Sequence, residues 1–323
     1  METVPCNLCG SADHRLVYRM PDVHYHPDEW FSVVACRGCG LGFVNPRPSY
    51  AEMARYYPSA FYDYFTEQPQ FHARRYAVEA RFVERAATTG GRRLLDVGCA
   101  NGDFPRYMQR LGWQVEGVEV SANTRQVGGF LVYAEHFPGI PVGEPTYDVV
   151  TAWAVLEHVH DPMAYFQKAA QVLKPGGAFV FLVTNFDSLS SRRLFREDPP
   201  RHLYFFTERA VREYVRATGF ALAAADYSDR VYGMHPVNWL VYYLHYRLRG
   251  REFRWPDAQA PISRQQYLEA GRLEPTRINS LRFAASHPVY VLDRLLMPLY
   301  ARWQMLTRRY GIVTYVARRA DRG

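Results

Sequence analysis

Several features of exported and membrane proteins are missing from this 323-residue chain. Its first ten residues, METVPCNLCG, hold no charged stretch followed by an apolar run, so we expect no signal peptide. No apolar run reaches about 18 residues, which argues against a membrane-spanning helix. We therefore expect a cytoplasmic protein, with any membrane contact peripheral.

Cysteine is scarce. Four of the five cysteines form two CxxC pairs, Cys6 with Cys9 and Cys36 with Cys39. In a reducing compartment such pairs indicate a bound metal and not disulfides. A glycine follows each pair, so the chain can turn and aim backbone amides at the thiolates. Four thiolates match a closed, tetrahedral zinc shell, and we predict a structural zinc ribbon over residues 1–48.

Neither sign of charge dominates, since 39 basic and 32 acidic residues leave a net charge of +7. A mildly basic balance is compatible with nucleic acid or an anionic substrate, and equally with a surplus of surface arginine. In the N-terminal module the charges are mixed: Asp13, Asp22, Asp28 and Glu29 offset Arg15, Arg19, Arg37 and Arg47. This mixture weighs against an RNA-binding surface there.

Helical and strand-like patterns divide the rest of the chain, which shows no internal repeat. We predict a helical bridge over 49–91, alternating strands and helices over 92–226, a helical insertion over 227–311, and a last strand with the tail over 312–323. Alternation of this kind predicts an α/β fold with a mostly parallel, Rossmann-like sheet.

The stretch LLDVGCANGDF, residues 94–104, reads as a buried strand followed by a glycine-rich loop. The loop lacks the Lys-Ser or Lys-Thr of a phosphate-binding P-loop. A dinucleotide loop would carry a third glycine where this chain has Asp103, whose carboxylate would oppose a pyrophosphate at a helix N-terminus. The ligand predicted here is therefore not a pyrophosphate.

A positively charged ligand fits this loop better. Asp96 at the strand end can lie near an ammonium group, while Gly98 and Gly102 allow close approach of the backbone. Glu119 ends the next strand, where a carboxylate can accept both hydroxyls of a ribose. S-adenosylmethionine (SAM) has a sulfonium, an ammonium and a ribose, and no phosphate.

With LLDVGCANGDF, VEGVEV, YDVVTAWAVLEHVHDP and LKPGGAFVFLV, the chain resembles the class I SAM-dependent methyltransferases. The resemblance implies a seven-stranded sheet whose last strand is antiparallel, with IVTYVARRA as that strand. It implies cofactor contacts at Asp96, Gly98, Cys99, Ala100, Gly102, Phe104, Glu119, Val120, His136, Phe137 and Trp153. Ala100 departs from the family's usual glycine.

The N-terminal cysteines, together with PPRHLYFFTERAVREYVRATGF, narrow the resemblance to a bacterial subgroup tied to sugar, polysaccharide or natural-product modification. We therefore expect methyl transfer to a hydroxyl or carbon of a sugar, glycan or other small molecule by in-line displacement. Positioning supplies much of the rate of such a reaction, and a base assists a hydroxyl acceptor.

His202 in PPRHLYFF is one candidate base, because the segment follows the fifth predicted core strand at the edge where ligands bind. Glu157 and His158 follow the fourth core strand and form a second candidate pair. In the similar ubiquinone-type enzymes this pair is implicated in acceptor handling and in holding a divalent ion. A purely structural role is the alternative for all three.

Two other functions stay open. An RNA methyltransferase would use the ribbon to hold nucleic acid, and a protein that is not an enzyme would use SAM and zinc for assembly. Within the insertion, residues 289–306 place apolar side chains at helical spacing around Pro298, which should kink or split the helix. This helix could close over an acceptor, contact a membrane or a lipid-linked acceptor, or form a homodimer.

Overall fold

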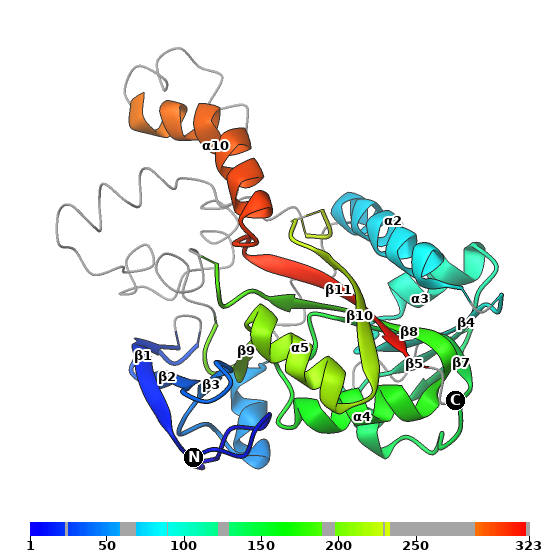
Figure 1. Cartoon of the computed structure of the whole chain (residues 1–323), viewed down its shortest axis with the longest axis horizontal. Coiled ribbons are helices and arrows are strands. Elements are labelled where there is room, and N and C mark those ends of the chain that lie inside the picture. The colour runs from blue at the N-terminus through cyan, green and yellow to red at the C-terminus, as the bar shows by residue number, and fades with distance from the viewer. Residues whose placement is uncertain are drawn as a thin grey trace.

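The computed structural model describes residues 1–22, 25–58, 69–88, 90–121, 129–188, 198–228, 230–232 and 288–320. Most of the predicted insertion, residues 233–287, lies outside the described residues. The two sheets and the helices that position the candidate site lie within them (Figure 1).

A seven-stranded sheet forms the centre of the fold. Its strands are β4 (Arg93–Val97), β5 (Gln114–Val118), β6 (Leu131–Tyr133), β7 (Tyr147–Trp153), β8 (Leu173–Thr184), β10 (Phe220–Asp226) and β11 (Ile312–Arg319), in the spatial order β10-β11-β8-β7-β4-β5-β6. Strands β4 to β8 are parallel, and β11 is antiparallel to both of its neighbours. The predicted seven-stranded α/β sheet with an antiparallel last strand is confirmed.

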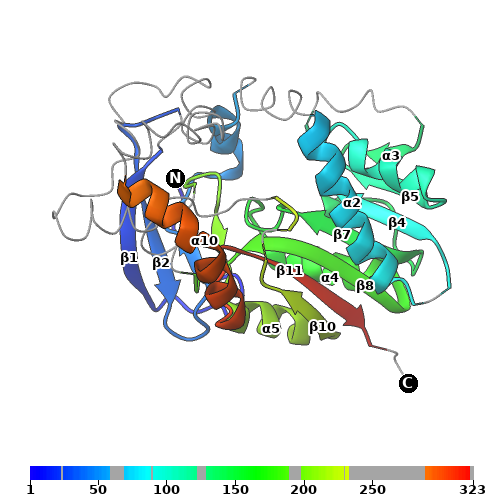
Figure 2. The same cartoon turned by 90° about the horizontal axis from the view of Figure 1, so that it is seen from above.

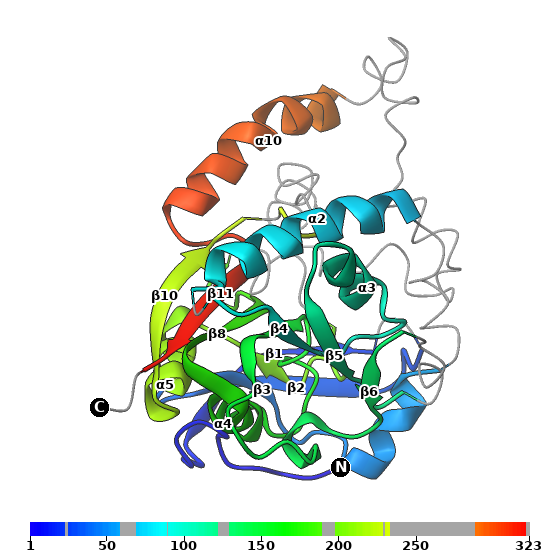
Figure 3. The ribbon, with the colours of Figure 1, turned by 90° about the vertical axis from the view of Figure 1, so that its right-hand side faces the viewer.

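Helices cover both faces of this sheet. α2 (Pro69–Ala86) and α3 (Asp103–Arg110) lie on one face, and α4 (Pro162–Val172) and α5 (Glu208–Ala217) lie on the other (Figure 3). Asp161 and Thr207 begin α4 and α5 as N-caps, since their side chains accept hydrogen bonds from Ala164 N and Ala210 N. These caps fix the residues at which the loops at the carboxyl edge of the sheet end and the two helices begin.

A second sheet forms beside the first from the N-terminal strands β1 (His14–Pro21), β2 (Trp30–Cys36) and β3 (Gly42–Val44) (Figures 1 and 2). Its fourth strand, β9 (Tyr204–Phe205), comes from the segment PPRHLYFF and pairs with β3. The N-terminal strands therefore do not form the whole of this sheet, because a segment that follows the core strand β8 supplies its fourth strand.

One buried arginine joins the two parts. Arg201 is fully buried, and its guanidinium donates to Asp22, at 2.8 Å from Nη2 to Oδ1, to both carboxylate oxygens of Asp198, and to the carbonyl of Tyr56. Tyr56 ends the 3-10 helix η1 (Tyr50–Tyr56), which follows the N-terminal sheet. A buried guanidinium is tolerable only when paired in this way, so these contacts fix the module against the core.

Helix α10 (Pro288–Leu306) precedes β11 and extends away from the sheet (Figure 3). The helix continues through Pro298, so of the two expected outcomes, a kink or a split, the split is excluded. Its exposed large apolar side chains are Leu292, Leu295, Leu299, Trp303, Met305 and Leu306. None of the helices in the described ranges is both long enough and apolar enough to cross a bilayer.

Replacement of Asp22 by alanine should destabilise the protein by about 3 kcal/mol, because Arg201 would lose a buried carboxylate partner. Urea unfolding followed by tryptophan fluorescence measures this loss. Arg216→Ala is the control, since its ion pair with Glu213 is exposed and the unfolding midpoint should not move. Equal stability of Asp22→Ala and wild type would contradict the joining role of Arg201.

Candidate functional site

A small cavity of about 50 Å³ opens at the carboxyl ends of β4 and β7. It is lined by Arg75, Tyr76, Asp96, Gly98, Cys99, Ala100, Asn101, Phe104 and Trp153. Six of these were predicted from the glycine-rich loop and its strands. Arg75 and Tyr76 were not predicted. They belong to α2, which lies over the loop and forms one wall of the cavity.

The loop after β4 is held in a strained turn. The amides of Gly98 and Cys99 both donate to the carbonyl of Val118 at the end of β5, and Gly98 and Gly102 have positive φ. Ala100 also lies in the left-handed region, with φ 47°, where alanine costs about 1–2 kcal/mol relative to glycine. Strain of this kind is concentrated at functional sites, and Ala100 adopts this turn at an energetic cost.

Asp96 is buried beneath this loop and accepts a hydrogen bond of 2.6 Å from Thr151 Oγ1. Burial raises the pKa of Asp96 to about 8; the Thr151 hydrogen bond opposes this shift, and the nearby carboxylate of Glu79 adds to it. Burial likewise raises the pKa of the Cys99 thiol, so this cysteine stays protonated. The cavity thus holds a carboxyl group that gains from a positively charged ligand.

Glu119, just after β5, accepts hydrogen bonds from the amides of Ala100, at 3.0 Å, and Ser121, at 2.8 Å. Its carboxylate is thereby oriented at the edge of the loop. Gly102 caps α3 without lining the cavity, and Val120 is half exposed beyond Glu119.

His136 and Phe137 follow β6, the outermost strand on that side. Phe137 begins the short 3-10 helix η4 (Phe137–Gly139); it is buried and packs edge-to-face on Tyr165 at 5.7 Å between ring centroids. The Nε2 atom of His136 lies within hydrogen-bond distance of the Tyr50 hydroxyl from η1. Through Tyr50, the segment that follows the N-terminal sheet therefore contacts the loop after β6.

Glu157, His158 and His202 come together although 44 residues separate the first from the last. One potential ligand atom from each lies within 4.8 Å of the others, so the same three groups could hold a metal ion. The two imidazoles are edge-to-face with centroids 4.6 Å apart. The structure thus brings both predicted catalytic segments to one place.

The environment of His158 favours its neutral form. Burial, with a smaller contribution from the His202 ring, lowers the pKa of His158 to about 3. Nδ1 of His158 lies 3.1 Å from the carbonyl of Arg201 and 3.0 Å from the Tyr57 hydroxyl. A carbonyl can only accept, so Nδ1 carries the proton and Nε2 keeps a lone pair that can take a proton from a ligand.

The four N-terminal cysteines form a compact cluster. Cys6 Sγ lies 3.4 Å from Cys39 Sγ, Cys9 Sγ lies 3.5 Å from Cys36 Sγ, and all four sulfurs are within 4.8 Å of one another. Each CxxC turn is closed by a glycine amide that donates to the carbonyl of the pair's first cysteine. Four thiolates at these separations fit a structural zinc.

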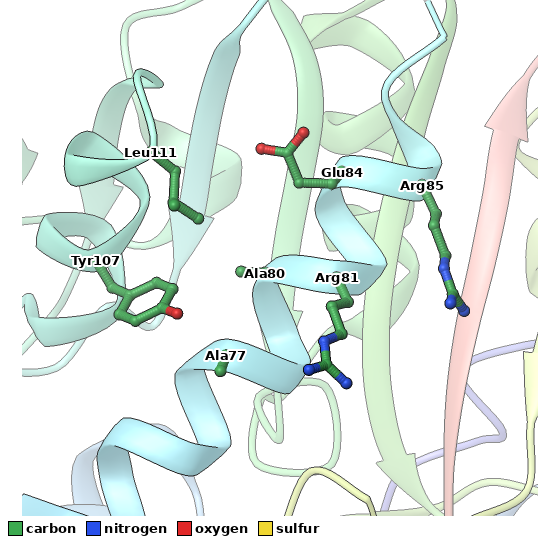
Figure 4. A pocket seen from close by; sticks show the side chains of 7 residues that line it. All are labelled: Ala77, Ala80, Arg81, Glu84, Arg85, Tyr107 and Leu111. Carbon is green, nitrogen blue, oxygen red and sulfur yellow. The ribbon is translucent and has the colours of Figure 1, made fainter.

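A larger groove of about 310 Å³ lies on the opposite face of α2, where Tyr107 and Leu111 face Ala77 and Ala80 (Figure 4). Its one carboxylate, Glu84, is already bonded to Arg92 and Trp113. The groove offers no loop amides, and its carboxylate is already paired. We therefore assign the functional site to the smaller cavity.

Comparison with known proteins defines the class. Residues 71–225 match the family model of a methyltransferase domain, and this range includes the cavity, the glycine-rich loop and the histidine pair. These residues, just under half of the chain, are therefore similar to a methyltransferase domain. The match leaves out the cysteine cluster, η1 and α10.

Two curated relatives share part of this domain. The chain is 36% identical over 116 residues to the ubiquinone biosynthesis O-methyltransferase of Vibrio cholerae, covering 32% of this chain and 46% of the relative. For the protein of the same name from Thiobacillus denitrificans, identity is 33% over 117 residues, covering 32% and 50%. The chain thus spans about half the length of the curated relatives it matches.

A similar solved structure is a SAM-dependent methyltransferase from Archaeoglobus fulgidus, with a TM-score of 0.48 and 17% identity. The similarity covers 79% of this chain and 99% of that one.

Zinc analysis tests the cysteine cluster. Freshly purified protein should contain about one zinc per chain by elemental analysis, and Cys36→Ala should lose it, because three thiolates leave the shell open. Cys99→Ala is the matched control, since Cys99 lies in the loop after β4 and should leave the zinc content unchanged. Full zinc content in Cys36→Ala would rule out the four-cysteine site.

Proposed function

We propose that this chain is a SAM-dependent methyltransferase that methylates a hydroxyl group of a small molecule, of the sugar, glycan or natural-product class. The observation that carries the proposal is the place of the cavity: it lies inside the methyltransferase domain, at the carboxyl ends of β4 and β7. Ligands of open α/β sheets bind at that edge.

The residues around the cavity fit SAM, which would supply the methyl group from its sulfonium. Asp96 would pair with the ammonium group, and Arg75, also in the lining, offers a guanidinium to the carboxylate. Glu119 would accept the ribose hydroxyls, and His136 with Phe137 would border the adenine. The cavity thus offers a group of suitable charge to both the ammonium and the carboxylate of the ligand.

The histidine pair would serve as the base. An acceptor hydroxyl displaces the methyl group from sulfur, the carbon–sulfur bond breaks toward sulfur, and the hydroxyl proton passes to an imidazole. His202 would take the proton, because a pKa of about 3 makes His158 a weak base; the neutral ring of His158 lies against His202 and would hold it in place. Glu157 is buried beside both and would stabilise the imidazolium that forms. In the alternative role of this cluster, the same three groups would hold a divalent ion.

The matched relatives support oxygen as the accepting atom, because their name describes O-methyltransferases of ubiquinone biosynthesis. The cysteine cluster, which we propose to be a zinc ribbon, would hold η1 and β9 around the acceptor. We place the protein in the cytoplasm. The exposed apolar stripe of α10 suits contact with a lipid surface, a lipid-linked acceptor or a second copy of the chain.

SAM binding should release a proton near pH 7. The free protein holds a proton on Asp96 below about pH 8, and the ligand's ammonium group favours the carboxylate, so the proton must leave. Affinity for SAM should therefore rise as the pH increases from 6 to 8 and then level off. Calorimetry in buffers of different ionisation enthalpy counts the protons, and Asp96→Asn should abolish the release. Binding without proton exchange in wild type would contradict this role of Asp96.

Methyl transfer tests the function itself. Wild-type protein incubated with methyl-labelled SAM and a fractionated lysate should label a small-molecule or glycan fraction. His202→Ala and His158→Ala should each lower the rate about 100-fold or more while binding SAM normally, because only proton transfer is lost. Label in a nuclease-sensitive fraction would indicate an RNA methyltransferase. SAM binding with no label in any fraction would favour a protein that is not an enzyme.

A further inference from the structure

One face of α2 points toward the cavity. Arg75 lines the cavity, and Phe82 packs against the cavity residue Trp153 with ring centroids 6.2 Å apart. Positions three, four and seven residues apart share a helix face, so Glu79 lies between Arg75 and Phe82 on that same face. The opposite face, with Ala77, Ala80 and Glu84, borders the larger groove.

Glu79 is an unusual residue for this position because it is 0% exposed. Its Oε1 atom accepts a hydrogen bond of 2.6 Å from Arg75 Nε, whereas Oε2 has no partner among the described residues. Trp153 Nε1, at the same cavity, is also buried without a partner in the described ranges. Buried polar atoms without partners are costly, so one in the cavity lining and one on the helix face that borders the cavity point to a ligand that is part of the functional state.

The charges around the cavity are unbalanced. Asp96, Glu79 and Glu119 influence one another electrostatically, and Arg75 is the basic group that offsets them. The guanidinium of Arg75 also lies 4.5 Å from the ring centroid of Tyr232, which fixes it over the cavity. Glu79 and Glu119, joined by Asp96 once it has released its proton, thus outnumber Arg75, and the cavity favours a ligand with net positive charge.

This imbalance matters because methyl transfer changes the ligand's charge. SAM carries a sulfonium, an ammonium and a carboxylate, for a net charge of +1. Its product, S-adenosylhomocysteine, has lost the sulfonium charge and is neutral. The two ligands otherwise differ by one methyl group, so a buried carboxylate near the site discriminates between them mainly through charge.

We propose that Glu79 is a specificity-determining residue that makes the cavity prefer the positively charged methyl donor over its neutral product. The inference rests on the proposed function and adds a selectivity to it. Glu79 acts through its charge and through the hydrogen bond that it accepts from Arg75. The preference for the charged donor promotes release of the neutral product after each transfer.

Calorimetric binding of three ligands to the full-length protein tests the proposal without knowledge of the acceptor. SAM and sinefungin, which carries an amine in place of the sulfonium methyl group, are positively charged, and S-adenosylhomocysteine is neutral. Glu79→Gln should weaken binding of both charged ligands about tenfold relative to the neutral one. Glu79→Asp, which keeps the charge, should retain most of the wild-type preference.

Glu84→Gln is the matched control, because Glu84 lies on the same helix and faces away from the cavity; its three affinities should equal those of wild type. An equal loss for all three ligands in Glu79→Gln would overturn the proposal and leave Glu79 a structural residue. Loss of the preference for positively charged ligands in Glu79→Asp would also overturn the proposal. Glu79→Asp is the variant that decides the test if Glu79→Gln does not fold. Failure of wild type to bind any of the three would instead refute the SAM site itself.

Discussion

The arrangement of the whole site depends on the burial of one guanidinium. Moving a charged arginine out of water costs several kcal/mol, and the cost is offset only when its partners are in place. The partners of Arg201 come from three stretches of chain: Asp22 after β1, Tyr56 at the end of η1, and Asp198 before β9. The two sheets can therefore take only the relative position in which these groups meet.

This constraint extends to the chemistry. The backbone carbonyl of Arg201 fixes the proton on Nδ1 of His158, and the next residue along the chain is His202. The strand that follows, β9, completes the sheet of the N-terminal module. The cysteine cluster is thus linked to the histidine pair through backbone pairing and one ion network, which is why we propose that the module lies on the acceptor side of the site.

Local patterns in the sequence were sufficient to predict much of this structure. The CxxC pairs, the loop after β4 and the alternating strands and helices of a mostly parallel sheet each follow from residues close together in the chain, whereas the number of strands and the antiparallel last strand were implied by the resemblance. Contacts between distant segments could not be predicted in this way. Asp22 and Arg201 are 179 residues apart, and the pairing of β3 with β9 joins segments of similar separation.

The charged residues of α2 show a different limit. Arg75 and Glu79 look like solvent-facing residues in an amphipathic helix, and only the tertiary structure shows that their face covers the cavity. Their i,i+4 spacing was the available signal, since a buried charge needs a partner at that distance.

A crystal structure with S-adenosylhomocysteine tests the central claim most directly, namely that one site joins the methyltransferase domain to the N-terminal module. The account predicts the amino-acid part of the ligand between Asp96 and Arg75, its ribose at Glu119, and its sulfur facing the His158–His202 pair. A ligand bound elsewhere, or one whose sulfur faces away from the two histidines, would contradict it.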